Sequence, residues 1–224
     1  MTTAIILAAG QGRRMGTSVP KQFLSVNGEP LIVRPLRVFA ASPVIDQILL
    51  VTSEDYISYC REEIVQKYEI PKVKDVIAGG KERYDSVYRA LLACEESDYV
   101  MVHDGARPFV TEEILQRCDE AMRAYDACAV GMPVKDTIKI ADEDGFAEQT
   151  PDRSRVWMIQ TPQAFSCKML KAANDLLREQ DAMNGVTDDA MIVERSGLAK
   201  VKLVEGSYSN IKITTPEDLR YLQD

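Results

Sequence analysis

The sequence predicts an α/β protein with a mostly parallel sheet flanked by helices. Short apolar runs alternate along the chain with segments of helical periodicity, which is the rhythm of successive strand-helix-strand units. Two of these runs, "QILLVT" and "DYVMVH", are apolar almost throughout, as expected of strands that are buried on both faces. No linker or repeat divides the 224 residues, and 46% of them are hydrophobic, so we expect one core and one domain spanning residues 1–224.

The expected elements follow from the spacing of apolar residues. The clearest helix is predicted over residues 83–95, where apolar side chains recur every three or four positions between Val87 and Leu92. Another helix is expected after Thr111, an N-capping residue that two glutamates follow. A last helix is expected to open at Thr215. The expected strands are residues 4–9, 47–52, 73–78, 99–103 and 128–134.

The alternation of strands and helices breaks after residue 133. The stretch "TIKIADEDGFAEQT" consists of two weakly alternating pieces around "DEDG", which predicts a hairpin with its turn at Asp144 and Gly145. A polar hairpin with little core of its own is marginal in isolation. We therefore expect residues 135–156 to form a β-arm that contacts a second subunit, which makes the protein a homodimer.

Composition excludes several classes of protein. The net charge of -8 argues against a general nucleic-acid binder and against an anionic membrane surface. No stretch approaches the roughly 18 apolar residues of a membrane-spanning helix. The five cysteines form no C-x-x-C pair, and the chain has one histidine, which argues against a structural zinc site. We expect a soluble cytoplasmic protein with no nucleic-acid or membrane partner.

The loop after the first expected strand, "AAGQGRRMG", is built for phosphate. Gly10 and Gly12 let backbone N–H groups face an anion, and Arg14 and Lys21 add positive charge. Met15 stands where a dinucleotide fold has its third glycine, and no Gly-Lys-Ser/Thr tripeptide follows, so neither common phosphate-loop pattern is present. A nicotinamide oxidoreductase is therefore disfavoured. A glycine turn with solvated arginines remains an alternative for this loop taken alone.

Two later loops also follow expected strands, where open parallel sheets bind ligands. In "GGKERYDS" the backbone at Gly80 and the hydroxyl of Ser86 suit the edge of a base, although a Gly-Gly pair is often only a turn. In "HDGARP" the carboxylate of Asp104 suits a Mg²⁺ ion bridging phosphates, or alternatively caps a helix. We expect the neighbouring His103 to be a structural, hydrogen-bonded residue and not a base.

The segment "NIKIT" near the end of the chain offers one more cation. If it forms a strand, Lys212 points away from the face that Ile211 and Ile213 occupy. Lys212 taken singly would be no more than a solvated lysine. Arg153 and Thr137, taken singly, would likewise be a surface charge and a strand former.

Taken together, the loops resemble the 2-C-methyl-D-erythritol 4-phosphate cytidylyltransferases. The matching segments occur in order over essentially the whole chain: "LAAGQGRRMG…PKQF", "GGKERYDSV", "HDGARPF", "PVKDT", "DR…W…QTPQAF", "TDDA" and "LVEGSYSNIKIT…EDL". The resemblance implies a Rossmann-like, Mg²⁺-dependent homodimer with a protruding β-arm. It implies transfer of CMP from CTP to a sugar-alcohol phosphate in non-mevalonate isoprenoid biosynthesis, with release of pyrophosphate.

The resemblance also implies roles for individual residues. Arg14 and Lys21 would stabilise the transition state, while Lys212 and Arg153 would position the acceptor phosphate. Asp104 would contact the nucleotide and be the one metal ligand, because Ser209 stands where some relatives carry aspartate. The nucleotide would also be bound by Ala8, Ala9, Gly10, Gly12, Gly80, Arg83 and Ser86. The acceptor would also be bound by Gly105, Arg107, Thr161 and Thr137, the last of these coming from the partner subunit.

Two other functions remain open on the sequence. A ribitol-5-phosphate cytidylyltransferase shares most of these loops, although "LAAGQGRRMG" and "HDGARP" are closer to the methylerythritol enzymes. A catalytically idle nucleotide-binding module is disfavoured, because binding alone does not require Arg14, Lys21 and Lys212 together with Asp104 and Arg153.

Overall fold

A seven-stranded sheet forms the centre of the molecule in a computed structural model that describes residues 1–10, 19–94 and 96–222. The strand order is β11-β7-β10-β6-β1-β4-β5. Every strand of this sheet runs in the same direction except β10, which is antiparallel to both of its neighbours. The bounds are β1 Thr2–Ala8, β4 Gln47–Thr52, β5 Val73–Ala78, β6 Tyr99–Asp104, β7 Ala127–Pro133, β10 Trp157–Ser166 and β11 Lys202–Glu205.

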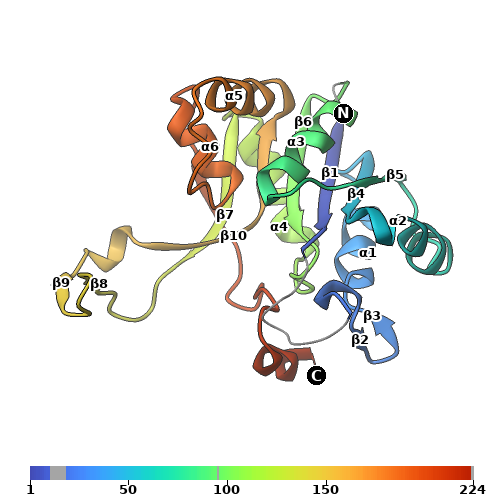
Figure 1. Cartoon of the computed structure of the whole chain (residues 1–224), viewed down its shortest axis with the longest axis horizontal. Helices are drawn as coiled ribbons and strands as arrows, with labels where there is room; N and C mark the ends of the chain where they lie inside the picture. The colour runs from blue at the N-terminus through green and yellow to red at the C-terminus, as the bar shows by residue number, and fades with distance from the viewer. Residues whose placement is uncertain (11–18, 95, 223–224) are drawn as a thin grey trace.

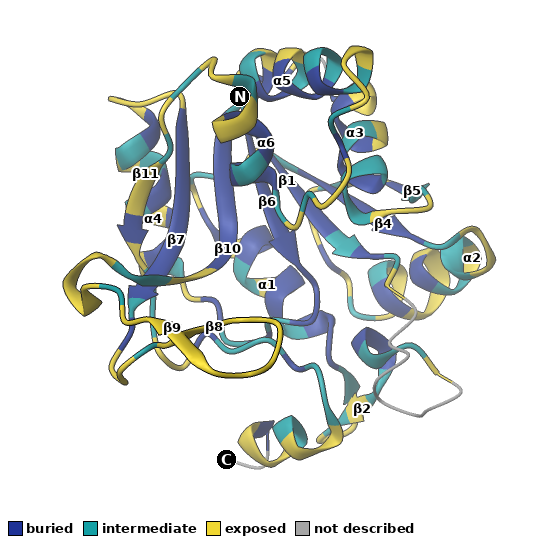
Figure 2. Ribbon diagram, turned by 60° about the vertical axis from the view of Figure 1, so that its left-hand side comes forward, coloured by how far each residue is buried: buried dark blue, intermediate teal, exposed yellow. Residues whose placement is uncertain are grey.

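Helices cover both faces of the sheet (Figure 1). Along β1, Ala4 and Ile6 face one apolar cluster, which includes side chains of α1 and α4, while Ile5 faces another, which includes side chains of α3, α5 and α6. This alternation is the two-residue period of a strand buried on both sides, and the buried sheet is visible in Figure 2. The bounds are α1 Val33–Ala41, α2 Ile57–Tyr59, α3 Arg83–Ala93, α4 Glu112–Met122, α5 Cys167–Glu179 and α6 Asp189–Ser196.

Shorter elements complete the chain. Two short strands, β2 (Ser25–Val26) and β3 (Glu29–Pro30), pair as a small hairpin. A π-helical turn over Cys60–Gln66 extends α2. The 3-10 helices are η2 Lys21–Phe23, η3 Glu54–Tyr56, η5 Arg153–Arg155 and η6 Pro216–Leu222.

The structure confirms the predicted fold class and the five predicted strands: β4 and β5 have the predicted ends, and the ends of the other three differ by at most two residues. The helix predicted over residues 83–95 is α3, and the helix expected after Thr111 is α4. The last helix is a 3-10 helix, η6. The segment "NIKIT" does not form a strand: residues 210–214 have no strand structure, although the N–H of Ile213 donates to the carbonyl of Ala106 at 2.9 Å.

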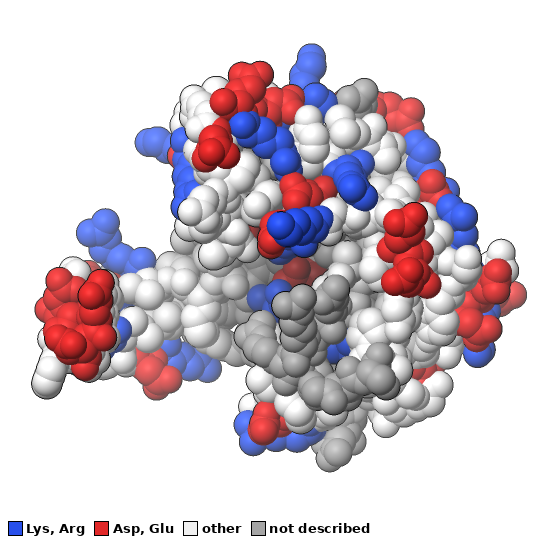
Figure 3. All heavy atoms as spheres, viewed as in Figure 1, with Lys and Arg blue, Asp and Glu red and all other residues white. Residues whose placement is uncertain are grey.

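The predicted hairpin is confirmed. Strands β8 (Ile140–Ala141) and β9 (Ala147–Gln149) pair antiparallel and project away from the sheet (Figure 1). At the turn Gly145 has a φ of +87°, a conformation that favours glycine. Phe146 beside it is 71% exposed, so the arm buries little of its own apolar surface. Acidic side chains gather at the tip of the arm, where Asp142, Glu143 and Asp144 are exposed (Figure 3).

Within the described residues, no helix combines the length and the apolar character needed to cross a membrane.

Candidate functional site

A cleft of about 810 Å³ opens at the carboxyl ends of the parallel strands. From β1 the chain passes to β4 and β5 on one side, then returns to β6 on the other side of β1, and such a change of direction is where open α/β sheets bind ligands. The lining comes from all four strand ends and from the C-terminal segment. The lining residues are Leu7, Ala9, Gly10, Lys21, Gln22, Ser53, Glu54, Gly79, Gly80, Lys81, Glu82, Arg83, Ser86, Asp104, Ala106 and Lys212.

A second depression, of about 580 Å³, lies between α1 and the start of α4. Its lining contains no lysine or arginine and includes the carboxylates of Glu112 and Glu113. A site for a polyanion needs local positive charge in a chain of net charge -8. The cleft at the strand ends, with Lys21, Arg83 and Lys212 in its wall, is therefore the candidate site.

The loop after β1 meets the loop after β5 at the floor of the cleft. A Cβ atom added to Gly79 would lie 2.7 Å from the Cβ of Ala9 and 2.7 Å from Oγ of Ser86, so glycine is required there by packing. Gly10 differs, because a Cβ added to it would meet no atom of residues 1–10, 19–94 or 96–222 within 4 Å. Packing against the described residues does not demand glycine at position 10, whereas the close approach of a ligand would.

The start of α3 is tightly packed beneath the same cleft. The N–H of Gly80 donates to Oγ of Ser86 at 3.0 Å, and the Ser86 hydroxyl donates to the carbonyl of Glu82 at 3.2 Å. Glu82 and Asp85 form a capping box that satisfies N–H groups of the first turn. Arg83 lies in this turn and reaches into the cleft.

Three cations surround the carboxylate of Asp104. Its oxygens lie 2.7 Å from Nζ of Lys212, 3.5 Å from Nε of Arg83 and 3.9 Å from Nε of Arg107. Burial by itself would raise the pKa of Asp104, but Arg83 and Lys212 outweigh that effect and hold the pKa well below its usual range. Asp104 is therefore ionised, and neighbouring cations stabilise its negative charge at the end of β6.

Arg83 is held from its other side by the buried Asp189, whose carboxylate lies 2.8 Å from Nη1. Burial opposes the positive charge of Arg83, yet Asp189 and Asp104 raise its pKa above the ordinary value. The Nη2 atom of Arg83 is buried and has no hydrogen-bond partner among the described residues. The guanidinium is thus held in place between the carboxylates of Asp104 and Asp189.

His103 belongs to the scaffold of the site, as the sequence predicted. The carbonyl of Arg107 lies 3.1 Å from Nε2 of His103 and can only accept, so the proton of the neutral ring is on Nε2. Nδ1 therefore accepts from the Thr161 hydroxyl at 3.1 Å, and Oγ1 of Thr161 in turn accepts from the N–H of Asp104 at 3.0 Å. Burial lowers the pKa of His103 to about 4, which keeps the ring neutral in this chain of hydrogen bonds.

The structure does not bring every predicted residue to the cleft. Gly105 is buried and its N–H donates to the carbonyl of Leu7 at 2.9 Å. Thr161 is 4% exposed, with its hydroxyl engaged by His103 and Asp104. Arg107 donates to the carbonyl of Asn210 at 2.8 Å, and its Nε lies 3.9 Å from the Asp104 carboxylate, but its side chain does not line the cleft.

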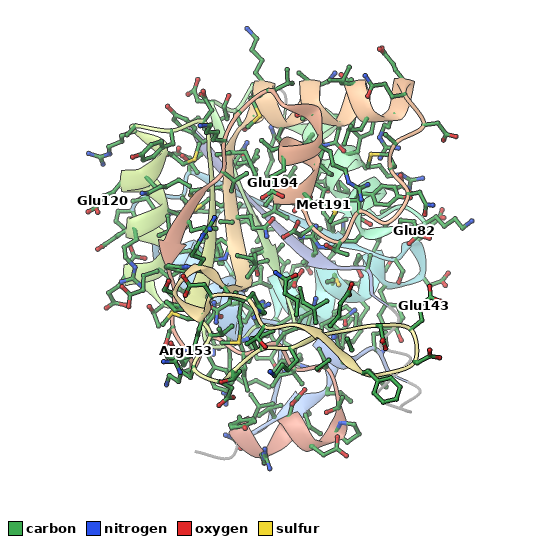
Figure 4. The ribbon with its side chains drawn as sticks, turned by 90° about the vertical axis from the view of Figure 1, so that its left-hand side faces the viewer. Glu82, Glu120, Glu143, Arg153, Met191 and Glu194 are labelled. Carbon is green, nitrogen blue, oxygen red and sulfur yellow. The ribbon has the colours of Figure 1, made fainter. Side chains whose placement is uncertain are left out.

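Other predicted residues lie on the arm or outside the described part of the chain. Thr137 and Arg153 are exposed on the arm, where Arg153 is labelled in Figure 4 and donates to the carbonyl of Lys135 at 3.0 Å. Gly12 and Arg14 lie outside the described residues. Ala8 is buried directly before the loop that begins the cleft.

The residues of the cleft fit a magnesium ion bound with a nucleotide. No group of three or more His, Cys, Asp or Glu side chains suited to a metal occurs among residues 1–10, 19–94 and 96–222. Mg²⁺ commonly takes only one or two protein carboxylates, with substrate phosphates and waters completing its shell. Asp104, a hard anionic ligand at the edge of the cleft, suits that role, whereas a metal cage made by the protein alone does not fit.

Sequence reasoning missed several residues of the site. Ser53 and Glu54 line the cleft after β4, a strand end at which the sequence shows no glycine-rich loop. Asp189 is in the quoted segment "TDDA", but a carboxylate distant in sequence gives no sign that it pairs with Arg83. Gln22 follows Lys21 directly and is 3% exposed. Nothing in the local sequence indicates that this polar residue is buried.

Comparison with known proteins agrees with this site and fold. The profile of the 2-C-methyl-D-erythritol 4-phosphate cytidylyltransferase family matches residues 2–223. The chain belongs to this family. The resemblance inferred from the loops of the sequence is therefore confirmed over nearly its full length.

Individual members of the family are close along their whole length. The chain is 50% identical over 219 residues to the 2-C-methyl-D-erythritol 4-phosphate cytidylyltransferase of Lachnospira eligens, covering 98% of this chain and 96% of the relative. It is 46% identical over 220 residues to the enzyme of the same name from Geobacter metallireducens, covering 96% and 93%. The crystal structure of 4-diphosphocytidyl-2C-methyl-D-erythritol synthase from Anaerococcus prevotii matches 99% of this chain and 94% of its own, with a TM-score of 0.86 and 35% identity.

Proposed function

We propose that this protein is a cytidylyltransferase that transfers CMP from CTP to 2-C-methyl-D-erythritol 4-phosphate. The products are 4-diphosphocytidyl-2-C-methyl-D-erythritol and pyrophosphate, in non-mevalonate isoprenoid biosynthesis. The observation that carries the proposal is the cleft at the carboxyl ends of β1 and β6, where Lys21, Arg83 and Lys212 line one cavity with Asp104. Family membership over residues 2–223 supports the same activity.

The nucleotide occupies the half of the cleft between the loop after β1 and the start of α3. Backbone groups of Ala8, Ala9, Gly10 and Gly12 bind the phosphates, and Gly80 with Ser86 meets the cytosine and ribose. The space at Gly10 supports this placement, because no atom of the described residues explains the glycine. Arg83 contributes the buried Nη2 donor that no described residue uses.

Electrostatic repulsion is the main barrier to the reaction. A phosphate monoester attacks the α-phosphorus of a triphosphate, so two anions approach while negative charge builds on the equatorial oxygens. Arg14 and Lys21 stabilise that charge, and Lys212 holds the acceptor phosphate in line. A fixed electrostatic contact of this kind commonly contributes about 10²–10³ in rate. The acceptor phosphate has a second pKa of about 6 and is ionised near neutral pH, so no general base is needed.

Asp104 would hold the Mg²⁺ ion that accompanies CTP. When bound, the ion neutralises charge on the triphosphate. Lys212 now lies 2.7 Å from Oδ2 of Asp104, so this lysine has a polar partner within the site until the substrates arrive. The acceptor side of the site is supported by three residues that do not line the cleft. Gly105 and Arg107 lie in the loop that follows β6, and Thr161 of β10 binds the N–H of Asp104.

We also propose that residues 135–156 complete the site of a second subunit in a cytoplasmic homodimer. Thr137 and Arg153 are exposed on an arm that projects away from the central sheet (Figure 1). The acidic tip of the arm would repel a phosphate, which favours the stretch around Arg153 as the part that meets the acceptor (Figure 3). Apolar side chains on or near the arm, such as Phe146 and Met158, remain exposed until a partner covers them.

The test of the activity is pyrophosphate release from CTP and Mg²⁺. 2-C-methyl-D-erythritol 4-phosphate and D-ribitol 5-phosphate are offered in parallel reactions. Turnover of the first alone supports the proposal. Turnover of the second alone keeps the nucleotide chemistry and overturns the acceptor, and binding of CTP without turnover of either makes the protein an idle nucleotide-binding module.

The test of the arm is complementation between two inactive chains. A Lys21→Ala chain and an Arg153→Ala chain are mixed, and mixed dimers are confirmed by mass spectrometry. Activity above that of either parent is expected, because one site of each mixed dimer then has both residues intact. Mixed dimers without recovered activity would mean that Arg153 does not serve the partner's site.

A further inference from the structure

Gln22 connects the helical turn that carries Lys21 with the end of β1 and the residues that directly follow it. Its side-chain amide nitrogen donates to the carbonyl of Ala8 and, at 3.0 Å, to the carbonyl of Gly10. Both acceptors are carbonyl oxygens, so only the NH₂ end of the amide can face them, and its two hydrogens serve one carbonyl each. Gln22 is 3% exposed, which makes these hydrogen bonds part of the interior.

The two hydrogen bonds fix the orientation of the peptides that start the cleft. A peptide unit is planar and trans, so the N–H of Ala9 points opposite to the carbonyl of Ala8. Holding that carbonyl toward Gln22 therefore turns the N–H of Ala9 away from Gln22. Without the amide, the buried carbonyl of Ala8 and the carbonyl of Gly10 would lose this donor, and the peptides would be held less firmly.

Gln22 is itself firmly anchored. Its carbonyl accepts from the N–H of Ile32 at 2.9 Å, at the entrance to α1. The next residue, Phe23, is 4% exposed and stacks on Tyr56 with ring centroids 5.0 Å apart. The preceding residue, Lys21, lines the cleft. Three consecutive residues of one short 3-10 turn thus have different roles. Lys21 lines the cleft, Gln22 hydrogen-bonds the residues after β1, and Phe23 packs in the core.

We propose that Gln22 is a positioning residue for the nucleotide: it sets the peptides of Ala8–Gly10 and the direction of Lys21 relative to each other. The inference rests on the proposed function, because it assumes that this loop and Lys21 act on CTP. On this proposal, the buried amide of Gln22 aligns Ala8–Gly10 with the turn that carries Lys21, two segments that residues 11–18 separate in the sequence.

The test uses Gln22→Met and Gln22→Glu in the full-length protein. Methionine keeps the length and volume of the side chain, so a residue that only fills space tolerates it. A role as hydrogen-bond donor predicts that both variants fail, since neither side chain can donate to the two carbonyls at neutral pH. The dissociation constant for CTP, measured by calorimetry without acceptor, should rise about 10-fold, and kcat/KM for CTP should fall about 10- to 100-fold.

Asn174→Leu is the matched control. Asn174 is a fully buried amide in α5 that donates to the carbonyl of Leu170 at 2.9 Å and does not line the cleft. This variant should lower the thermal midpoint and leave kcat/KM of the folded enzyme unchanged. If Gln22→Met behaves in the same way, with a normal CTP dissociation constant, the positioning role is overturned.

A double variant separates the two elements that Gln22 joins. In a Lys21→Ala background, the further loss of kcat caused by Gln22→Met should be smaller than in the wild type, because part of its effect passes through Lys21. Full additivity in kcat, with unchanged CTP affinity, would overturn the inference. Failure of the proposed function is distinguishable, since it appears in the wild type as absence of turnover, before any variant is compared.

Discussion

Substitution of Gly80 by alanine tests how closely the start of α3 is packed beneath the cleft. The new Cβ would lie 2.3 Å from the Cβ of Asp85 and 3.0 Å from its backbone carbonyl carbon. Carbon atoms in ordinary contact are about 3.5 Å apart, so one of the two residues has to move by roughly 1.2 Å. Asp85 cannot move alone, because it belongs to the capping box of α3 and accepts a hydrogen bond from Arg178 at 2.9 Å.

The expected cost follows from that displacement. Overpacking of a well-filled site destabilises a protein by about 1–3 kcal/mol, and we expect the free energy of unfolding to fall by that amount. The first turn of α3 carries Arg83 and Ser86, both in the cleft wall. A shift of about 1 Å in groups that position a substrate can lower the rate about 10²-fold, so kcat/KM for CTP should fall about 10- to 100-fold.

Urea unfolding and CTP calorimetry measure the two effects separately, with Gly10→Ala as the matched control. A Cβ at Gly10 meets no atom within 4 Å in the described part of the chain, so the free energy of unfolding should stay within about 0.5 kcal/mol of the wild type. CTP should nevertheless bind more weakly, because the methyl group occupies ligand space. A Gly80→Ala protein with wild-type stability and CTP affinity would refute the reasoning from packing.

Three further outcomes are expected. Asp104→Asn should lower kcat about 10²–10³-fold and raise the Mg²⁺ concentration needed for half-maximal rate; a magnesium titration at saturating CTP measures this, and an unchanged half-maximal concentration would contradict the ligand role. His103→Phe should lower the free energy of unfolding by about 2–4 kcal/mol, because the Thr161 hydroxyl and the Arg107 carbonyl lose buried partners; a loss below about 1 kcal/mol in urea would contradict the hydrogen-bond chain. All five cysteines are buried, and burial raises the pKa of Cys60 to about 11. A thiol reagent should therefore label the native protein slowly and the guanidinium-unfolded protein fully. Rapid labelling of the native protein would show that the core opens.

The sequence was sufficient to predict the parallel part of the fold, because strands buried on both faces leave long apolar runs. It was not sufficient for β10, whose buried Gln160 and Gln163 interrupt the apolar pattern. The structure shows why glutamine is tolerated there: the side-chain oxygen Oε1 of Gln163 accepts from the N–H groups of Asp189 and Ala190 at the start of α6. A polar residue that caps a distant helix reads as a surface residue in the sequence.

The candidate site shows the same division. Strand-end loops predicted that Gly10, Gly80 and Asp104 would converge, since carboxyl ends of parallel strands share one edge of the sheet. Lys212 joins them, but through a segment without strand structure, because its alternation with isoleucines reflects packing of Ile213 and not a ladder. Partners that depend on tertiary contacts, such as Asp189 for Arg83, leave no local pattern to detect.

The path of β10 bears on how strain could travel between the arm and the body. Between its two registers with β7, β10 advances by four residues, from Ile159 to Gln163, while β7 moves by two, from Gly131 to Ala129. The two extra residues of β10 form a bulge, and Thr161 within it accepts a hydrogen bond from the N–H of Asp104. The strand that leaves the arm is therefore bonded directly to the backbone of the carboxylate residue in the cleft, so the arm and the cleft share one mechanical connection.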